Sequence, residues 1–276
     1  MDSTACSAGS APCLARTTPH HRPRLRARCC RWSGISCAPP SACSASRGLH
    51  AAGSGGEPQL PVGTQWPKGD KGTLDFVARL SLAEMQASLS VPWLPAEGAL
   101  LFFHGHGGRG RSPKDRANHV VLLVEDLENP QVSTATVGSG RRQRHTGGNV
   151  RPVLIQTLPP IDDPLLEPLD LGDEESDAYV ELQDVALGDG PRHQFLGYDD
   201  PIQYAGMQSD CEAMANGQDD VEPTLAAQRW ELLLQLDDDE AIGFSWGDGG
   251  RLYFWVEPER AASSDFSNVW RMFQCH

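Results

Sequence analysis

Two histidines separated by one glycine give this sequence its clearest opportunity for chemistry. His104 and His106 lie in the segment FFHGHGG, at the end of a hydrophobic run. Histidines at this spacing can chelate a metal ion, but a metal site needs a third protein ligand, and none is evident nearby in the sequence. The flanking glycines favour a loop with exposed, unligated histidines. The sequence therefore predicts neither a metal nor a cofactor.

An acidic run, Asp237-Asp238-Asp239-Glu240, is the second candidate. Carboxylates can hold Ca²⁺ or Mg²⁺, but this run lacks the alternating ligands and distal glutamate of a calcium loop. Adjacent like charges repel one another and favour a solvated turn. We expect an acidic, solvated turn here.

The segment Trp246-Gly247-Asp248-Gly249-Gly250 is the third candidate. Asp248 could act as a general base, but no nucleophile or second carboxylate accompanies it at a telling spacing. Asp and Gly together are typical of a tight turn that leads into a strand. The glycine-rich segment HGHGGRGR, over residues 104–111, lacks the terminal Lys-Ser/Thr of a phosphate loop.

Cysteine usage argues against a disulfide framework. Six of the eight cysteines fall within residues 1–43, and only Cys211 and Cys275 lie beyond them. The six are irregularly spaced, without the paired C-x-x-C arrangement of a zinc site. We expect Cys211 and Cys275 to be small buried groups in a reducing, cytoplasmic environment.

Charge is distributed unevenly along the chain. Residues 1–50 hold seven Arg and one Asp, whereas residues 51–276 hold 16 basic and 36 acidic residues, for a total net charge of -14. Such an acidic body should repel nucleic acid and anionic membranes, and it suits a basic protein partner. A basic cluster at Arg141, Arg142, Arg144 and His145 is interpreted as a solvated loop, with an anion contact as the alternative. No window reaches 18 consecutive apolar residues, so no membrane span is predicted.

Hydrophobic patterns predict a mainly β chain with short helices. In the segment LDFVARLSL, alternate residues from Leu74 to Leu82 are apolar and should share one face. In GRLYFWV, both alternating faces are apolar, which favours a central core strand over an exposed aromatic platform. Further strands are expected over 98–103, 119–125, 153–158, 230–236 and 269–275, with helices near 174–187, 208–215 and 258–264.

Two of these segments repeat. LDFVARLSLAE, residues 74–84, aligns without gaps with WELLLQLDDDE, residues 230–240. Downstream, GALLFF from Gly98 aligns with GRLYFW from Gly250. This self-similarity predicts a duplicated strand–loop–strand unit, and two such units should pack around a shared core.

Residues 1–53 differ from the rest of the chain. They are rich in Ala, Ser, Cys and Arg, and show no helical or strand period. A transit peptide would share this composition. We expect a disordered leader, or a stretch that is not translated in this frame, followed by a single domain over residues 54–276.

Several multi-residue segments occur in a recognisable order: GEPQLPVGTQWP, FLGYDDPIQ, WELLLQL, WGDGGRLYFWV and DFSNVWRMFQC. With these segments the chain resembles the YwqG-like family of bacterial proteins of unknown function, from about residue 54 to the C-terminus. The resemblance implies a compact α+β fold with internal duplication and a cytoplasmic location. Some relatives resemble immunity proteins encoded beside secreted toxins, which implies a protein-binding role.

We therefore expect an α+β, mainly β domain without an assigned catalytic residue. The leading hypothesis is a non-enzymatic protein-binding module, similar to an immunity protein or antitoxin, that captures a basic partner. The alternatives are a hydrolase using Asp248 with His104, His106 or His193, and a small-molecule-binding protein with a pocket between the halves. The candidate binding surface comprises Asp237, Asp238, Asp239, Trp246 and Asp248.

Overall fold

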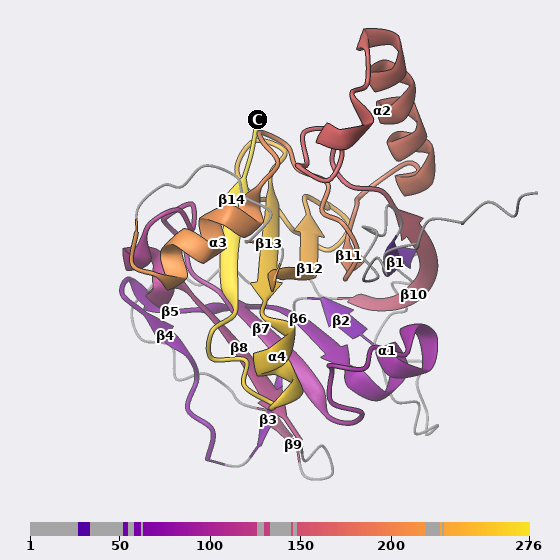
Figure 1. Ribbon diagram of the computed structural model, residues 1–276. Coiled ribbons are helices and arrows are strands. Elements are labelled where there is room, and N and C mark those ends of the chain that lie inside the picture. The colour runs from indigo at the N-terminus through magenta and orange to yellow at the C-terminus, as the bar shows by residue number, and fades with distance from the viewer. Residues whose placement is uncertain are drawn as a thin grey trace, which may run out of the picture.

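Antiparallel strands dominate the computed structural model, which describes residues 27–33, 52–54, 58–61, 63–125, 130–132, 145, 148–218, 227 and 229–276 (Figure 1). The strands are β1 (Ala27–Ser33), β2 (Ala52–Ser54), β3 (Gln59–Pro61), β4 (Lys68–Gly69), β5 (Gly72–Thr73), β6 (Asp75–Ser81), β7 (Ala99–His104), β8 (His119–Val124), β9 (Pro130–Val132), β10 (Gly148–Thr157), β11 (Gln194–Phe195), β12 (Glu231–Asp237), β13 (Arg251–Val256) and β14 (Trp270–Gln274). The helices are α1 (Leu82–Leu89), α2 (Asp173–Leu187), α3 (Met207–Ala215) and α4 (Pro258–Ala262), with short 3₁₀ turns at Pro113–Asn118 and Glu167–Leu169. This mainly β, α+β architecture confirms the predicted fold class.

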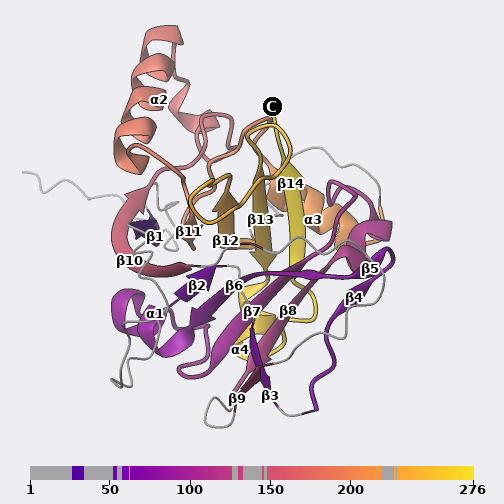
Figure 2. The ribbon, with the colours of Figure 1, turned by 180° about the vertical axis from the view of Figure 1, so that it is seen from behind.

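One continuous sheet carries most of the strands, in the order β14-β13-β12-β11-β1-β10-β2-β6-β7-β8. Its neighbouring strands are antiparallel. The sheet curls until its two ends face each other, so that β12–β14 form one layer and β6–β8 the other (Figures 1 and 2). Two small sheets, β3 with β9 and β4 with β5, lie outside it.

The two layers are copies of one hairpin, with the same pairing register. The matching pairs are Phe76–Phe103 with Leu232–Trp255, Ala78–Phe102 with Leu234–Phe254, and Leu80–Leu100 with Leu236–Leu252. Each hairpin also has a bulge at the equivalent position, Val77 in the first and Leu233 in the second. Identical register and identical bulge position confirm the duplication predicted from the sequence.

The bulge corrects one prediction about the first strand. The apolar residues from Leu74 to Leu82 do not share a single face: Leu74 and Phe76 pack in an outer cluster, whereas Ala78 and Leu80 pack in the core between the layers. A bulge sets two residues of one strand against one of its partner, so the side chains beyond it change face. The alternating pattern in the sequence carried no sign of this extra residue.

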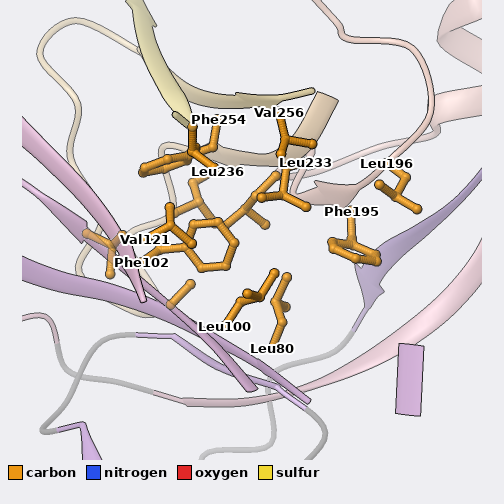
Figure 3. Close-up of a cluster of buried hydrophobic side chains, with 14 of the residues drawn as sticks. Leu80, Leu100, Phe102, Val121, Phe195, Leu196, Leu233, Leu236, Phe254 and Val256 are labelled. Carbon is orange, nitrogen blue, oxygen red and sulfur yellow. The ribbon is translucent and has the colours of Figure 1, made fainter. Parts of the chain in front are cut away.

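Phe102 and Phe254, the equivalent residues of the two hairpins, meet at the centre of the shared core (Figure 3). Their ring centroids lie 5.1 Å apart with planes at 73°, and neither side chain is exposed. Edge-to-face contacts of this kind add about 0.5–1.5 kcal/mol to the free energy gained by burial. The two copies thus stabilise each other by direct contact.

Each layer is also covered on its outer face. Helix α3 contributes Met207 and Cys211 to a cluster with Tyr253 and Trp255 of β13. On the other layer, Leu60 and Trp66 pack with residues of β6 and β7. The aromatic strand GRLYFWV is therefore core on both faces, as predicted, and is not an exposed platform.

Helices α2 and α3 lie close to their predicted positions, but α1 was not predicted. Leu82 and Met85 pack α1 onto the shared core, and Ser90 ends it in the left-handed conformation at φ 53°. The side chain of Gln86 holds the following turn by donating to the carbonyls of Val91 and Leu94. No helix in the described ranges is both long enough and apolar enough to cross a membrane.

Two strands fall at or before the predicted boundary between leader and domain. Strand β1 pairs with β10 and β11, and β2 pairs with β10 and β6, so both join the main sheet. This differs from the disordered leader expected to include residues 27–33. The rest of the predicted leader lies outside the described residues, and the domain boundary stays a prediction.

Truncation of the central aromatic pair should destabilise the fold strongly. We expect Phe102→Ala and Phe254→Ala each to lower the free energy of unfolding by about 3–5 kcal/mol, because each leaves a cavity in a core that cannot collapse freely. The double variant should lose less than the sum, because each single change already removes the shared contact. Denaturant unfolding measures these losses.

The matched control for these variants is Val185→Ala on the exposed face of α2, which should change stability by less than about 0.5 kcal/mol. A loss below about 1 kcal/mol for Phe102→Ala would contradict the shared core.

Candidate functional site

A pocket of about 310 Å³ opens between the two halves, where β7 ends and β13 begins. The first half lines it with His104, His106 and the loop through Arg109, and the second half lines it with residues 245–247, Leu252 and Phe273. We call this the histidine pocket. Its walls come from both copies of the repeat, so neither half forms it alone.

His104 is buried, which corrects the prediction that both histidines are exposed. Strand β7 extends as far as His104, whose backbone pairs with Asp75 on one side and His119 on the other. The residue is 7% exposed, and Nδ1 has no hydrogen-bond partner among the described residues. Burial holds the pKa of His104 well below its usual value, and the nearby Arg271 lowers it further, so the ring is neutral.

His106 differs from His104 in its environment, because it has a carboxylate partner. Nε2 of His106 lies 3.0 Å from Oδ2 of Asp75, and the two side chains are 57% and 3% exposed. The hydrogen bond to Asp75 raises the pKa of His106 above its ordinary value, against a smaller opposing effect of burial. One neutral and one readily protonated imidazole therefore lie side by side, with ring centroids 6.0 Å apart.

Asp75 was not among the site residues predicted from the sequence. The available signal was an acidic residue at the start of an otherwise apolar strand, but its partner lies 31 positions downstream on a loop after the next strand. Only the antiparallel pairing of β6 with β7 brings Asp75 next to the histidines.

Trp246 forms the aromatic wall of the histidine pocket. Its ring lies 5.6 Å from that of His104, 5.3 Å from that of His145 and 4.8 Å from that of Phe244, centroid to centroid. Its indole N–H donates to the carbonyl of Asp237 at 3.1 Å, which fixes the ring orientation. His145 is itself buried, so the solvated loop predicted there is wrong at this residue; Arg141, Arg142 and Arg144 lie outside the described residues.

The glycine-rich loop after β7 is held from behind by a buried cation. Arg271 of β14 is fully buried and donates to the carbonyls of Gly108 and Gly107 at 3.1 and 3.4 Å. Burial lowers the pKa of Arg271 to about 10, so it stays protonated at neutral pH. Gly108 has φ 71°, and a Cβ there would fall 1.8 Å from the carboxylate of Asp115. Glycine is therefore required at this position.

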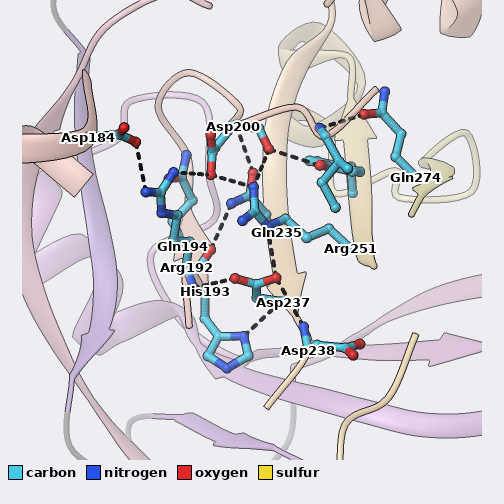
Figure 4. Close-up of polar contacts among 12 residues, drawn as sticks. Asp184, Arg192, His193, Gln194, Asp200, Gln235, Asp237, Asp238, Arg251 and Gln274 are labelled. Atoms are coloured by element: carbon cyan, nitrogen blue, oxygen red, sulfur yellow. Dashed lines mark hydrogen bonds and ion pairs between the residues drawn. The ribbon is translucent and has the colours of Figure 1, made fainter. Parts of the chain in front are cut away.

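A second polar cluster, which we call the Asp200 network, lies at the ends of β11–β14 (Figure 4). The carboxylate of Asp200 accepts from Arg192 at 2.9 Å and from Arg251, and Arg251 also donates to Asp237 at 2.8 Å. The side chain of Gln235 accepts from the Asp200 backbone N–H at 3.0 Å. These contacts fasten the loop that contains FLGYDDPIQ to the sheet.

The strands supply further anchors for the same loop. Gln274 of β14 accepts from the N–H groups of Ile202 and Gln203 at 2.8 and 2.9 Å, and the hydroxyl of Tyr253 donates to the Asp200 carbonyl at 2.9 Å. Nearly every polar group of this cluster is used inside the protein. We therefore interpret the Asp200 network as structural.

The residues of the predicted binding surface lie near this network. Asp237, Asp239 and Trp246 are buried, Asp238 is partly buried, and Asp248 is exposed. The carboxylates of Asp237, Asp238 and Asp239 accept hydrogen bonds from Arg251, the Trp246 backbone and the Ala241 backbone, respectively. The three aspartates of the acidic turn are thus not solvated as expected, because their carboxylates are used within the fold, whereas Glu240 is exposed. That these residues bind a partner stays a prediction.

The hydrolase alternative required Asp248 to meet a histidine. His104 and His106 line one pocket, but neither His193 nor Asp248 lines it. His193 instead accepts from the Asp237 N–H at Nδ1 and lies 3.1 Å from Asp239 at Nε2. Ser245 lines the pocket, yet no hydrogen bond joins it to a histidine within the part of the chain that the structure describes. Cys211 is buried in the α3 cluster, and burial raises its pKa, which disfavours the reactive thiolate form.

Metal binding finds no support in the geometry. The described ranges contain no group of three or more His, Cys, Asp or Glu side chains that could hold a metal ion. The chemistry available in the histidine pocket is hydrogen bonding, proton exchange at His106, and stacking or apolar contact with Trp246, Leu252 and Phe273.

Fold and pocket together define a class: an internally duplicated, mainly antiparallel β protein with a small polar–aromatic pocket between its halves. A family model for a domain of unknown function, DUF1963, matches residues 54–275, and the chain belongs to this family. No curated protein matches the chain.

Removing the charge of Asp75 should lower the pKa of His106. The raised pKa means that His106 adds stability below its unfolded-state pKa, and this is lost as pH rises through the folded-state value. We therefore expect Asp75→Asn to cost more stability near about pH 5.5 than near about pH 8.5. NMR titration of the imidazole measures the pKa, and denaturation at both pH values measures the stability.

Asp70→Asn, on the exposed turn between β4 and β5, is the control that removes the same charge away from His106. It should leave the titration of His106 unchanged. An unchanged pKa in Asp75→Asn would refute the role of this pair.

Proposed function

We propose that the protein binds a small molecule in the histidine pocket. One observation carries the proposal: His104 lines the pocket, and its buried Nδ1 has no hydrogen-bond partner among the described residues. An unsatisfied buried polar atom is costly, and such atoms concentrate where a ligand supplies the missing partner.

The shape and the lining of the pocket support this proposal. Its volume of about 310 Å³ lies at the lower end of the range usual for ligand sites. Trp246, Leu252 and Phe273 offer apolar contact, and the two histidines offer directed polar contact. Ligand pockets characteristically combine a mainly apolar wall with a few placed polar groups.

Binding is better supported than hydrolysis. A hydrolase needs a nucleophile held by its base, and the described part of the chain shows no hydroxyl or thiol bonded to His104 or His106. The pair of His106 and Asp75 could move a proton, but it lacks a positioned group to activate. We therefore propose a binding protein.

Filling the pocket should abolish ligand binding without unfolding the protein. Ser245 is exposed and lines the pocket, so Ser245→Tyr places a ring in the opening at little cost to the core. Ser88→Tyr, on the exposed side of α1, is the matched control. In ligand-observed NMR against a collection of small molecules, compounds that bind the wild type should bind Ser88→Tyr equally and Ser245→Tyr at least about tenfold more weakly. If no compound distinguishes the two variants, the proposal fails.

A separate surface favours a second candidate function, the capture of a basic protein. Helix α2 projects from the body in both ribbon views (Figures 1 and 2). Its inner side is fastened by Tyr179 and Gln183, which donate to the carbonyl of Pro159 at 2.9 and 2.6 Å. Its outer side is left to solvent, and there Leu182 and Val185 are 47% and 79% exposed.

The exposed side of α2 carries charge as well as apolar surface. Ala178, Leu182 and Val185 form a stripe at helical spacing, and Glu174, Glu175 and Glu181 flank it. A basic amphipathic segment of a partner protein would match both features, since apolar anchors at such spacing are typical of helix-in-groove recognition. The protein-binding, immunity-like role and the YwqG-like membership inferred from the sequence belong to this second proposal.

Polar substitution of the stripe tests this second function. Leu182→Ser with Val185→Ser should weaken a salt-sensitive interaction with a basic amphipathic peptide by about tenfold, because apolar burial is lost while the charge is kept. Val180→Ser, on another side of the same helix, should not weaken it. Isothermal titration against a synthetic Leu/Lys helical peptide gives the values. If Leu182→Ser with Val185→Ser binds the peptide as tightly as Val180→Ser does, the attraction is non-specific. That result would refute the proposed binding surface on α2.

A further inference from the structure

Main-chain amides beside the histidine pocket are oriented by Arg271. The guanidinium of this fully buried residue can only donate hydrogen bonds, and it donates to the carbonyls of Gly107 and Gly108. In a trans peptide, the carbonyl and the following N–H point in opposite directions, and the described chain has no cis peptide bond. The N–H groups of Gly108 and Arg109 therefore point away from Arg271.

These two amides are free to donate. Neither the Gly108 N–H nor the Arg109 N–H has a hydrogen-bond acceptor among the described residues. Both residues line the histidine pocket. The next glycine is already used, because the Gly110 N–H donates to Asp115 at 2.9 Å. Adjacent free amides on left-handed glycine backbone are a typical cradle for an anion.

The side chains around this loop add positive charge. Arg109 and His106 line the same pocket, and Lys71 lies against Gly107. The negative charges of Asp75 and Asp115 counteract this positive charge. Asp75 is paired with His106, however, and the carboxylate of Asp115 accepts a hydrogen bond from the Gly110 N–H. In a body with 36 acidic and 16 basic residues over 51–276, this is a local concentration of donors and cations.

We propose that the histidine pocket takes a ligand with an oxyanion, a carboxylate or a phosphate, which the amides of Gly108 and Arg109 and the side chains of Arg109 and His106 bind. The inference rests on the proposed pocket function and specifies its ligand class. The remainder of the ligand packs against Trp246 and Phe273. Such a site joins charge-assisted hydrogen bonds at one end to apolar contact at the other.

NMR titration of the full chain with inorganic phosphate and, separately, with acetate tests the inference. The amide resonances of Gly108 and Arg109 should shift with at least one of the two anions, and which anion binds more tightly identifies the source as phosphate or carboxylate. We expect Arg109→Gln and His106→Asn each to weaken binding about three- to tenfold.

The matched control is Arg111→Gln, which removes the same charge two positions along the chain. Arg111 lies outside the pocket, over the ring of Tyr204 and 3.5 Å from Asp210. It should leave anion binding unchanged; an equal loss in Arg111→Gln and Arg109→Gln would mean unspecific attraction and would overturn the inference.

A parallel titration with neutral compounds that bind the pocket separates this inference from the proposed function. If neutral compounds bind, but neither anion shifts these amides, the oxyanion site is refuted and the pocket function stands. If Ser245→Tyr blocks the binding of no compound of any kind, both the pocket function and the oxyanion site are refuted.

Discussion

The contact between Phe102 and Phe254 is the interaction on which the rest of the structure depends. Each ring belongs to one copy of the same bulged hairpin, and each is buried because the other copy covers it. A single hairpin with two apolar faces is not stable alone, since both faces would remain in water. The duplication solves this problem by setting the inner faces against each other, while α3 and the segment around Trp66 cover the outer faces.

The two copies share the same strand pairing but carry different polar side chains. The position of His104 in the first copy is occupied by Val256 in the second, and that of His119 by Val269. The first copy therefore supplies the titratable groups of the pocket, together with Asp75 and the glycine loop. The second copy supplies Arg271 from behind and the aromatic wall through Trp246. The two sides of the pocket therefore differ in their functional groups, although the strand register of the two hairpins is the same.

Acidic residues in this protein serve two different ends. Around β12 and β13 they are used inside the fold, where Asp200 and Asp237 accept hydrogen bonds from Arg192 and Arg251 and hold the loop against the ends of the strands (Figure 4). Removing one charged group of this half-buried network would leave its partner desolvated and unpaired. The network therefore fixes the position of the loop. On α2 the acids remain in solvent beside an apolar stripe. Net charge alone does not separate these roles.

The sequence by itself determined the strands of both hairpins, the helices α2 and α3, the duplication and the burial of GRLYFWV, because period and self-similarity are local properties of the chain. It did not determine the bulge at Val77, the helix α1 or the strand β1, since these depend on pairing and packing with distant segments. For the site, it identified His104, His106 and Trp246 as notable, but not Asp75 or Arg271, and it expected Asp237 and Asp239 to be solvated. Partners separated by tens to more than a hundred residues meet only when the sheet closes, and closure also decides which charges lose their water.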